Sequence, residues 1–311
     1  MKEFQHTKES RKCELSNNTY WGIGGPCERF YIINNNHQLR ALLNNPINTD
    51  LITIGNGTNL LFDSEGYQGT IVKLGAGFDF INVLDDCVEV GASTWVPGLV
   101  RNLSTLGFGS LDHCVGIPAT IGGLIAMNGG SQRRSISEVI NSVEVMDFSG
   151  KIFHLDNKEC EFNYRHSIFS NDNFIILSAK LNVEKIQPNS NRKNLIEILR
   201  ERRLKFPRKQ PNCGSVFKSS PELYKKIGPP GLIIESLGLK GFSIGGAKVS
   251  EIHANFIVNT GEATSKDVIE VVDHINQMCF LKYGFEMEAE AIFVDQFGNS
   301  TPLHKVTLID K

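Results

Sequence analysis

Clustered glycines are the feature that most limits how this chain can fold. The chain has 29 glycines among 311 residues, above the usual ~7 %. Glycine has no Cβ atom, so it permits tight turns and lets the backbone approach a ligand or another strand closely. The clusters lie at residues 22–25, 55–57, 75–77, 122–123 and 129–130, with short apolar runs between them. We therefore expect short elements joined by tight turns in the first half of the chain.

The apolar runs between these glycines have the length of β-strands, and other segments have helical spacing. Strands are predicted at residues 51–54, 70–74, 87–90, 142–146 and 174–177. Helices are predicted at residues 39–43, 96–106 and 264–278, and in the segment 192–209. Strands outnumber helices before residue 185, so the sequence predicts an α+β fold.

The segment 192–209 carries eight basic and two acidic residues beside its apolar stripe. Such a segment is either a nucleic-acid patch or a solvated helix that links two domains, and we favour the linker. Pro207 and Pro211 are expected to end this helix. The formal net charge of the whole chain is −2, which argues against nucleic acid as its main partner.

Composition also limits the cellular location. The polar start of the chain has no apolar core of signal-peptide length, and no uncharged apolar stretch reaches the length of a membrane span. The seven cysteines are unevenly spaced and include no C-x-x-C pair, so we expect reduced thiols, no metal and a cytoplasmic protein without membrane partners.

The first glycine segment of chemical interest is LITIGNGTNLLF, residues 51–62. A predicted strand runs into Gly55-Asn56-Gly57-Thr58-Asn59, where successive backbone N–H groups can turn toward one centre and bind an anion. The side chains of Asn56, Thr58 and Asn59 can add hydrogen bonds to a phosphate. Asn-Gly is equally the signature of a plain tight turn, and this segment alone leaves both interpretations open.

The second segment is GIPATIGGLIAMNGG, residues 116–130. Pro118 suits the first turn of a helix, and Asn128-Gly129-Gly130 suits its end. A helix start after a glycine-bearing loop is an anion site, although a glycine-rich helix packed on a sheet gives the same pattern. Two such segments about 60 residues apart indicate a ligand with a pyrophosphate.

Several familiar fingerprints are missing from the sequence. It has no G-x-G-x-x-G that opens a helix and no G-x-x-x-x-G-K-[ST], which excludes a Rossmann site and a P-loop. It also lacks H-E-x-x-H and G-x-S-x-G. The pyrophosphate ligand therefore requires another kind of fold.

Three later segments carry candidate chemistry. Arg165 offers a forked donor to a carboxylate or an anionic intermediate, or else forms a surface ion pair. Ser215 lies in a Gly-Ser step that is expected to lead into an apolar strand, and it can present its hydroxyl as a proton donor or serve only as a turn residue. Residues 285–293 alternate, so Glu286, Glu288 and Glu290 are expected on one strand face, which is active or simply solvated. Cys213 as a nucleophile lacks a helper histidine at a recognisable spacing.

These segments together resemble the UDP-N-acetylenolpyruvoylglucosamine reductase family in order and spacing, from about residue 20 to residue 292. The segments that carry the resemblance are IGGP at 23–26, GNGTNLLF at 55–62, GIPATIGGLIAMNGG at 116–130, YRHSIF at 164–169, GSVF at 214–217, residues 237–246 and HANFIVN at 253–259. The short connection after Phe169 resembles the compact form of the family. The resemblance implies an α+β FAD-binding fold of the vanillyl-alcohol-oxidase type, with FAD between two subdomains, followed by a substrate-binding domain. The implied parts are residues 1–74, 75–205 (with the linker helix) and 206–311.

The resemblance also implies a reaction and its residues. NADPH passes a hydride to FAD, and the enolpyruvyl ether of UDP-N-acetylglucosamine then takes that hydride at its vinyl carbon and a proton from Ser215, which gives UDP-N-acetylmuramate. Arg165 would stabilise the developing negative charge, and Glu290 would orient and polarise the site. The implied cofactor-binding set is Gly55, Asn56, Gly57, Thr58, Asn59, Gly116, Ile117, Pro118, Ala119, Thr120, Gly122, Gly123, Asn128 and Gly129.

The implied role is an oxidoreductase of peptidoglycan precursor synthesis, and hence of cell-wall biogenesis, cell shape and cell division. Two other functions stay open: a flavin oxidoreductase of the same fold with another substrate, and a flavin- or nucleotide-binding regulator without turnover. Arg165, Ser215 and Glu290 argue against the regulator. Four stretches depart from the family pattern. The small changes at Ala119-Thr120 and Asn128-Gly129-Gly130, beside the phosphate, are expected to be tolerated, whereas residues 131–134 and 229–232 affect the expected substrate contacts. His166, Lys218, Tyr224 and Lys225 are further candidates for contact with the substrate diphosphate.

Overall fold

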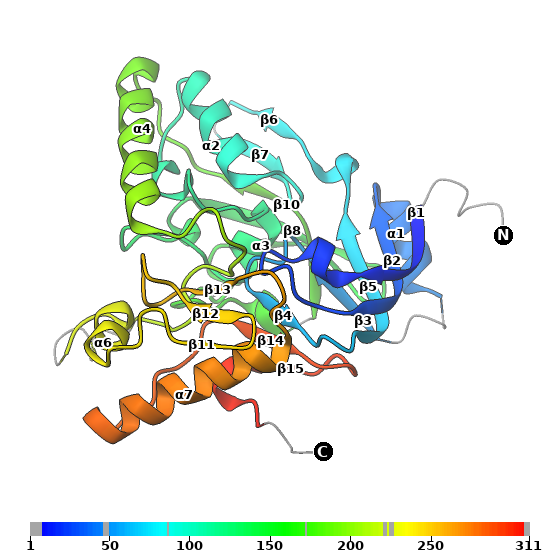
Figure 1. Cartoon of the computed structure of the whole chain (residues 1–311). Coiled ribbons are helices and arrows are strands. Elements are labelled where there is room, and N and C mark those ends of the chain that lie inside the picture. Colours follow the sequence, from blue (N-terminus) through cyan, green and yellow to red (C-terminus); the bar gives the residue numbers. More distant parts are fainter. Residues whose placement is uncertain are drawn as a thin grey trace. The chain divides into compact units, whose positions relative to one another are not determined.

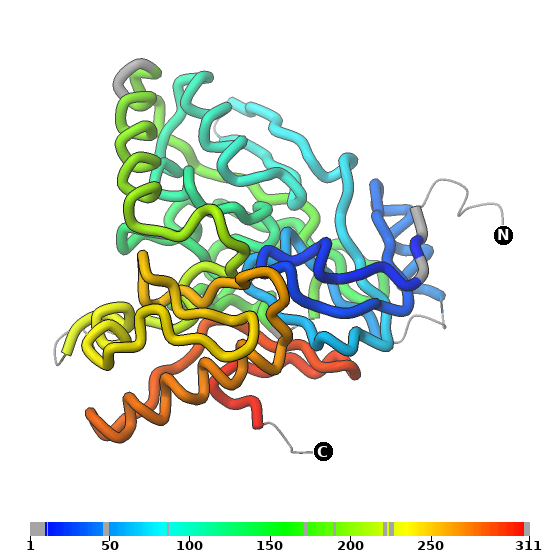
Figure 2. Tube along the Cα trace, viewed as in Figure 1, coloured from blue at the N-terminus to red at the C-terminus, as the bar shows by residue number. Residues whose placement is uncertain are grey.

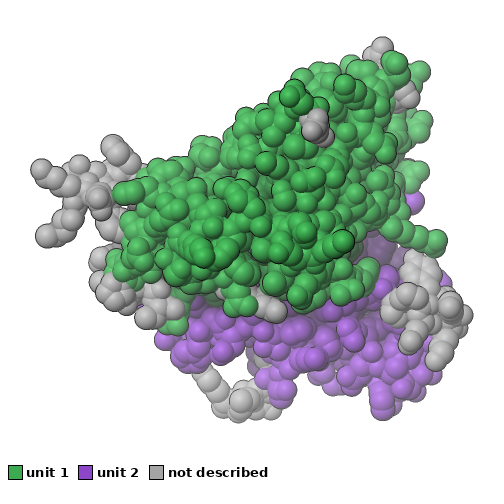
Figure 3. All heavy atoms as spheres, turned by 180° about the vertical axis from the view of Figure 1, so that it is seen from behind, with its two compact units in different colours: residues 1–10, 29–56, 70–202 green, residues 11–28, 57–69, 203–311 purple. Residues whose placement is uncertain are grey.

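The computed structural model describes residues 8–45, 50–85, 87–171, 173–219, 223 and 227–307 (Figures 1 and 2). The chain divides into two compact units, each built from several stretches of sequence (Figure 3). Unit 1 comprises residues 1–10, 29–56 and 70–202, and unit 2 comprises residues 11–28, 57–69 and 203–311. Because neither unit is continuous in sequence, residues far apart in the chain must meet within each one.

The largest sheet lies in unit 1 and has five strands in the order β6-β7-β10-β8-β9. Its neighbouring strands pair antiparallel, with Ala179 opposite both Val90 and Val143. The strands are β6 (Ile81–Val83), β7 (Val88–Gly91), β8 (Ile140–Asp147), β9 (Ile152–Asp156) and β10 (Phe174–Leu181). The buried side chains of β7, β8 and β10 join those of α2 (Val96–Thr105) and α3 (Ile121–Ala126) in one apolar core.

A second sheet has four strands in the order β1-β2-β5-β3. They are β1 (Lys8–Glu14), β2 (Pro26–Ile33), β5 (Tyr67–Leu74) and β3 (Leu51–Ile54). β3 and β5 run parallel, with Ile52 opposite Ile71. Helix α1 (Asn36–Leu43) begins where the Asn35 side chain accepts a hydrogen bond from the Gln38 N–H, and it adds Leu39 and Leu42 to the core of unit 1.

Unit 2 contains two three-stranded sheets, β11-β12-β13 and β15-β14-β4. The strands are β4 (Leu60–Phe62), β11 (Ser243–Ile244), β12 (Ala247–Val249), β13 (Ile257–Asn259), β14 (Ile292–Val294) and β15 (Ser300–Pro302). β14 pairs parallel with β4, so Phe293 lies opposite Leu61 from the first quarter of the chain. The apolar face of α7 (Ser265–Tyr283) joins the core of this unit together with α6 (Pro230–Ser236).

Helix α7 shows how local sequence sets an element's limits. The Thr264 hydroxyl accepts from the Asp267 N–H while the Asp267 carboxylate accepts from the Thr264 N–H, which forms a capping box. Gly284 ends the helix at a φ of 75°, a left-handed conformation that glycine adopts readily. The remaining helices that lie wholly within the described residues are α4 (Pro188–Lys205) and six short 3-10 segments, η1 (Leu15–Asn18), η2 (Ala76–Phe78), η3 (Asp112–Cys114), η4 (Ile136–Glu138), η5 (Ile168–Asn171) and η6 (Leu303–Lys305).

The predicted α+β class is confirmed, and each predicted strand before residue 185 appears, as β3, β5, β7, β8 or β10. The bounds agree within two residues except that β5 begins three residues earlier than predicted and β10 extends four residues further. The helix predicted in segment 192–209 starts earlier, at Pro188, and ends before Pro207 as expected. The prediction of one strand over residues 285–293 is wrong, because the regular strand in this part of the chain is only Ile292–Val294. The division at residues 74/75 and 205/206 stays a prediction. None of the helices within the described residues is long and apolar enough to cross a membrane.

Candidate active site

A cavity of about 190 Å3 opens in unit 1 beside the two glycine-bearing segments. Five residues predicted to bind the cofactor line it: Gly55, Asn56, Thr120, Gly122 and Gly123. Its other walls come from the strands β3, β5 and β10 and from the rings of Phe148, Phe169 and Phe174. The backbone at Gly55, Gly122 and Gly123 therefore forms a cradle without side chains, and the other walls offer apolar surface suited to a flat ring system.

Thr120 connects the two segments at this cradle. It is the N-cap of α3, and its hydroxyl accepts from the Gly123 N–H at 3.3 Å. The Asn56 amide donates to the Pro118 carbonyl at 3.0 Å, which fastens the first segment to the second. A Cβ atom on Gly55 would lie 2.5 Å from Thr120 Oγ1, so only glycine fits there. Pro118 precedes the N-cap by two residues, and the prediction that it lies in the first helical turn is wrong.

Thr53 and Lys73 add further polar groups to the wall of this cavity. Within the described residues, Thr53 Oγ1 is a buried oxygen without a hydrogen-bond partner. Lys73 also lines the cavity, and its burial lowers the pKa of the ammonium group. An unsatisfied hydroxyl, a cation and a glycine cradle fit a nucleotide ligand that carries phosphate, such as FAD. Sequence reasoning missed Thr53 and Lys73 because isolated polar residues within strands carry no motif.

The later part of the first segment belongs to unit 2. Gly57 has a φ of 60° and its carbonyl accepts from the Tyr20 N–H at 3.1 Å. Thr58 is partly exposed. The Asn59 amide donates to the Glu290 carbonyl at 3.0 Å, and the Asn59 carbonyl accepts from the Ile292 N–H. Asn59 therefore holds the segment that carries Glu290, and its contact with a cofactor stays a prediction.

The loop before α3 is fixed by backbone contacts. An Arg202 Nη2 N–H donates to the Gly116 carbonyl at 2.9 Å. Ile117 donates its N–H to the Cys114 carbonyl, and Ala119 accepts from the Val96 N–H through its carbonyl. These bonds set the path of the backbone around the predicted pyrophosphate loop.

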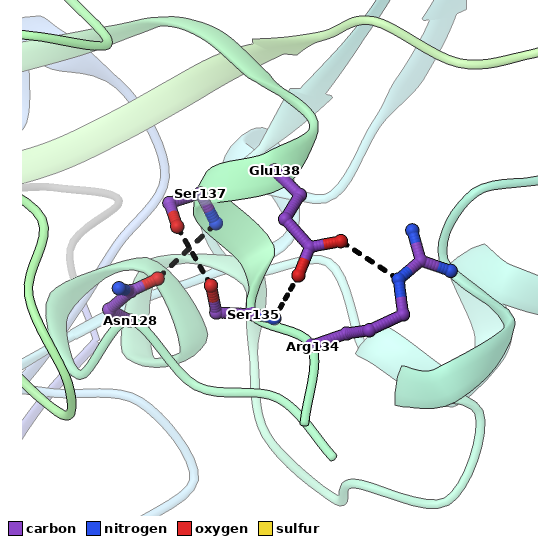
Figure 4. A network of polar contacts seen from close by, with 5 residues as sticks. All are labelled: Asn128, Arg134, Ser135, Ser137 and Glu138. Atoms are coloured by element: carbon purple, nitrogen blue, oxygen red, sulfur yellow. Dashed lines mark hydrogen bonds and ion pairs between the residues drawn. The ribbon is translucent and has the colours of Figure 1, made fainter. Parts of the chain in front are cut away.

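Asn128 and Gly129 end α3 as predicted, and the Asn128 side chain also forms hydrogen bonds to two other segments (Figure 4). Its amide donates to the Asn163 carbonyl at 2.8 Å, and its Oδ1 accepts from the Ser137 N–H at 3.2 Å. Asn128 is 5 % exposed and has a φ of 42°. It thus ties the end of α3 to the turn that carries Arg165.

Arg165 lies in a tight turn in which Asn163 and His166 exchange backbone hydrogen bonds. Its φ of 55° is uncommon for a residue with a side chain, so the surrounding structure must hold it there. The guanidinium lies over the Tyr164 ring at 5.2 Å and donates to the Gly130 carbonyl at 3.4 Å. Arg165 therefore points back toward the end of α3 within unit 1.

Ser215 follows an Asn-Cys-Gly turn in unit 2. The Asn212 side chain accepts from the Gly214 N–H at 2.9 Å, and Gly214 has a φ of 91°. The next residues run extended but are not a regular strand, contrary to the prediction. Instead, the buried Asn255 side chain both donates to and accepts from the Phe217 backbone, each at 2.9 Å.

Glu290 is held next to this segment, because its N–H donates to the Val216 carbonyl at 2.7 Å. Asn276 pairs with the Met287 backbone as Asn255 does with Phe217, at 3.0 and 3.1 Å. Burial alternates from Met287 to Ala291, which explains why this segment resembles a strand in sequence. The structure thus brings Ser215 and Glu290 onto neighbouring segments, while Arg165 belongs to the other unit.

Cys213 is no nucleophile in this arrangement. Burial raises the pKa of its thiol, and the nearby Glu290 carboxylate raises it further. The thiol therefore stays protonated near neutral pH, which agrees with the absence of a helper histidine in the sequence.

The other sequence candidates are placed only in part. The Lys218 ammonium group pairs with the Glu288 carboxylate at 3.6 Å. Tyr224 and Lys225 lie outside the described residues. In the divergent stretch 131–134, the Ser131 hydroxyl donates to the carbonyl of the buried His113, and Arg134 pairs with Glu138 at 2.8 Å (Figure 4). In the stretch 229–232, Pro230 begins α6. No group of side chains suited to a metal ion occurs among the described residues.

Comparisons with known proteins agree with this geometry. Residues 19–156 match the model of an FAD binding domain, and residues 206–294 match the C-terminal domain of UDP-N-acetylenolpyruvoylglucosamine reductase. The α+β fold, the glycine cradle and the first of these matches define a flavoprotein. The two matches follow each other along the chain in the order expected for one two-part enzyme.

Full-length relatives identify the family. The chain is 37 % identical over 308 residues to UDP-N-acetylenolpyruvoylglucosamine reductase 1 of Corynebacterium glutamicum, with 98 % of this chain and 90 % of the relative covered. It is 35 % identical to the reductase of Prochlorococcus marinus, with 91 % and 97 % covered. The crystal structure of the Thermus caldophilus reductase superimposes with a TM-score of 0.79 at 27 % identity, with 93 % and 98 % covered. The chain belongs to the UDP-N-acetylenolpyruvoylglucosamine reductase family.

Proposed function

We propose that this chain is an FAD-dependent oxidoreductase that uses NADPH to reduce the enolpyruvyl ether of UDP-N-acetylglucosamine to UDP-N-acetylmuramate, a precursor of peptidoglycan. The observation that carries the proposal is that Ser215 and Glu290 lie on adjacent segments of unit 2 in a chain of which 98 % matches a reductase of this family. The reduced cysteines and the NADPH requirement support a cytoplasmic enzyme with small-molecule partners.

The residues around the cavity of unit 1 would hold the cofactor. The Gly55–Asn56 and Gly122–Gly123 backbones leave room for a phosphate-bearing ligand, and Lys73 adds a positive charge. Thr53 Oγ1 would gain the hydrogen-bond partner that it lacks. FAD, when bound, supplies the hydride-carrying ring system between NADPH and the enolpyruvyl ether.

The chain's own side chains would then handle charge and proton. Addition of a hydride to the vinyl carbon leaves negative charge on the neighbouring carbon and its carboxylate. The Arg165 guanidinium is suited to stabilise that charge, because it is always protonated and presents several N–H donors. The Ser215 hydroxyl would deliver its proton to the carbanion, which completes addition of two hydrogens across the double bond.

A serine hydroxyl is a weak acid, so it needs help from its surroundings. The Glu290 N–H donates to the carbonyl of Val216, the residue that follows Ser215. The Glu290 side chain is therefore suited to orient and polarise the Ser215 hydroxyl. Burial, followed by the Glu290 carboxylate, raises the pKa of the Cys213 thiol, so this carboxylate lies close to the turn that carries Ser215. A strongly basic carbanion in a water-poor site can take a proton even from this donor.

The test measures the two half-reactions, flavin reduction and flavin reoxidation, separately in the variant Ser215→Ala. We expect NADPH to reduce the bound flavin at the wild-type rate, followed by a ~10²–10⁴-fold slower reoxidation by the enolpyruvyl substrate, since a positioned proton donor contributes that much. Anaerobic stopped-flow absorbance of the flavin measures both steps, and Ser243→Ala, an exposed serine in the same unit, is the control. Wild-type rates in both steps would remove Ser215 as the donor, and a flavin that this substrate never reoxidises in the wild type would favour another substrate.

A further inference from the structure

Two cysteines of unit 2 lie opposite each other on neighbouring strands. β1 carries Cys13 and β2 carries Cys27, and the two strands are adjacent in their sheet (Figure 1). Beyond the strand ends, Leu15 donates its N–H to the Gly25 carbonyl, which fixes an antiparallel register. Counting two residues back from Leu15 and two forward from Gly25 brings Cys13 opposite Cys27. Directly opposed residues have Cα atoms about 4.5–5.5 Å apart, which is within the span of a disulfide.

The burial pattern places both thiols on the same face. Cys13 is partly buried between exposed Lys12 and Glu14, and Cys27 is 1 % exposed between exposed Pro26 and Glu28. Burial raises the pKa of Cys27 to about 11, with a further contribution from Cys13. Cys13 is therefore the thiol that a reagent can reach, and Cys27 is its buried neighbour.

We propose that Cys13 and Cys27 form a reversible thiol pair that a low-molecular-weight disulfide oxidises. The Cys13 thiolate attacks one sulfur of that disulfide and releases the first small thiol, which leaves a mixed disulfide on Cys13. The Cys27 sulfur, after loss of its proton, then attacks the Cys13 sulfur and releases the second small thiol. Two protein thiols are oxidised to one disulfide, and one external disulfide is reduced to two thiols.

This pair is connected to the predicted pyrophosphate loop, a step that rests on the proposed function. The Asn18 amide donates to Cys13 Sγ at 3.5 Å and to the Glu14 carbonyl at 3.3 Å. The backbone of Asn18 and Thr19 closes over Gly57, where an added Cβ would lie 2.7 Å from the Asn18 carbonyl oxygen. When Cys13 Sγ turns toward Cys27, the Asn18 amide loses that acceptor. Oxidation therefore loosens the turn against the Gly57 loop and weakens flavin binding.

Peptide mapping tests the pair itself. Lys12 and Arg29 bound one tryptic peptide that contains both cysteines and ends with Arg29. Holoenzyme treated with oxidised glutathione, then unfolded in denaturant, alkylated and digested, should yield this peptide without alkyl groups. Untreated or re-reduced holoenzyme should yield it with two. Cys13→Ser should remain alkylated at Cys27, and Cys87→Ser, at another partly buried cysteine, should behave as wild type. Full alkylation of the wild-type peptide after oxidation would overturn the proposal.

Flavin release tests the connection. Oxidised holoenzyme should bind flavin about tenfold more weakly, the loss expected when one supporting hydrogen bond is removed. Fluorescence of the released flavin measures this affinity, which should recover on reduction and stay unchanged in Cys13→Ser. Equal affinities in the two redox states, with the disulfide formed, would reject the connection. A wild type that never carries flavin would reject the proposed function, while the peptide map would still decide the thiol pair.

Discussion

The cavity of unit 1 and the Ser215–Glu290 region of unit 2 are built in different ways. The cavity lies where the ends of regular strands meet the N-terminus of α3, and glycines keep its wall free of side chains. The Ser215–Glu290 region has almost no regular structure, and the buried side chains of Asn255 and Asn276 take the place of strand partners. A binding cradle for a large ligand thus depends on missing side chains, whereas the reactive pair depends on particular side chains being present.

The strongest test of this difference fills the cradle. Gly123 lies in α3, and a Cβ atom there would meet Thr120 Oγ1 at an ordinary 3.4 Å, so a side chain is tolerated by the fold. We expect Gly123→Leu to lower FAD affinity at least a hundredfold, ~2.7 kcal/mol, because the side chain enters the cavity. Fluorescence titration with FAD measures this, and Gly123→Ala is the graded control. Undiminished affinity in the leucine variant would move the cofactor away from this cavity.

The next test removes a side chain on which the reactive region depends. Asn255→Ala and Asn276→Ala each leave a buried backbone N–H and carbonyl without partners, so each should lower the free energy of unfolding by about 2–3 kcal/mol. Urea denaturation measures the loss. Asn299→Ala, at an exposed asparagine of the same unit, should change little. If all three variants are equally stable, the asparagines do not replace strand partners.

A pH test addresses the core of unit 1. His113 is buried, and burial, followed by the nearby Arg134, lowers its pKa to about 4. The unfolded chain binds a proton near pH 6.5 and the folded chain does not, so stability falls as pH drops below 6.5. His113 should account for about 2 kcal/mol of stability lost between pH 7.5 and 5. In His113→Leu, urea denaturation at both pH values should show that much less dependence on pH. If the free energy of unfolding of this variant changed with pH as much as that of the wild type, His113 would be protonated within the fold.

The smallest expected effect concerns residues 131–134, the divergent stretch that follows α3 in unit 1. The Arg134–Glu138 pair is exposed, so Arg134→Ala should change the free energy of unfolding by at most about 0.5 kcal/mol. The bond from the Ser135 N–H to Glu138 keeps the local cap in place. FAD titration of the same variant should give the wild-type affinity. A large loss of affinity would show that this stretch, in which the chain departs from its family pattern, contacts the ligand.

Sequence patterns predicted the two regions unequally. The periodicity of residues 51–54 and 174–177 and the clustered glycines sufficed for the strands and the cradle, because both follow from local backbone preferences. The segment around Glu290 alternates like a strand, but its partners are an asparagine side chain and a short bridge from Phe217. Such partners come from distant positions and leave no period in the sequence. Arg165, Ser215 and Glu290 gained their roles through family resemblance, and those roles stay predictions.

The parallel pairing of β4 with β14 has a consequence for synthesis of the chain. Leu60–Phe62 leaves the ribosome early, while its partner Ile292–Val294 is made more than 200 residues later. At roughly 5–20 residues per second, β4 waits about 10–45 s with an apolar edge unpaired. Newly made chains therefore pass through a stage in which residues 57–69 are exposed to aggregation or to chaperones, and completion of unit 2 depends on the last translated fifth of the protein.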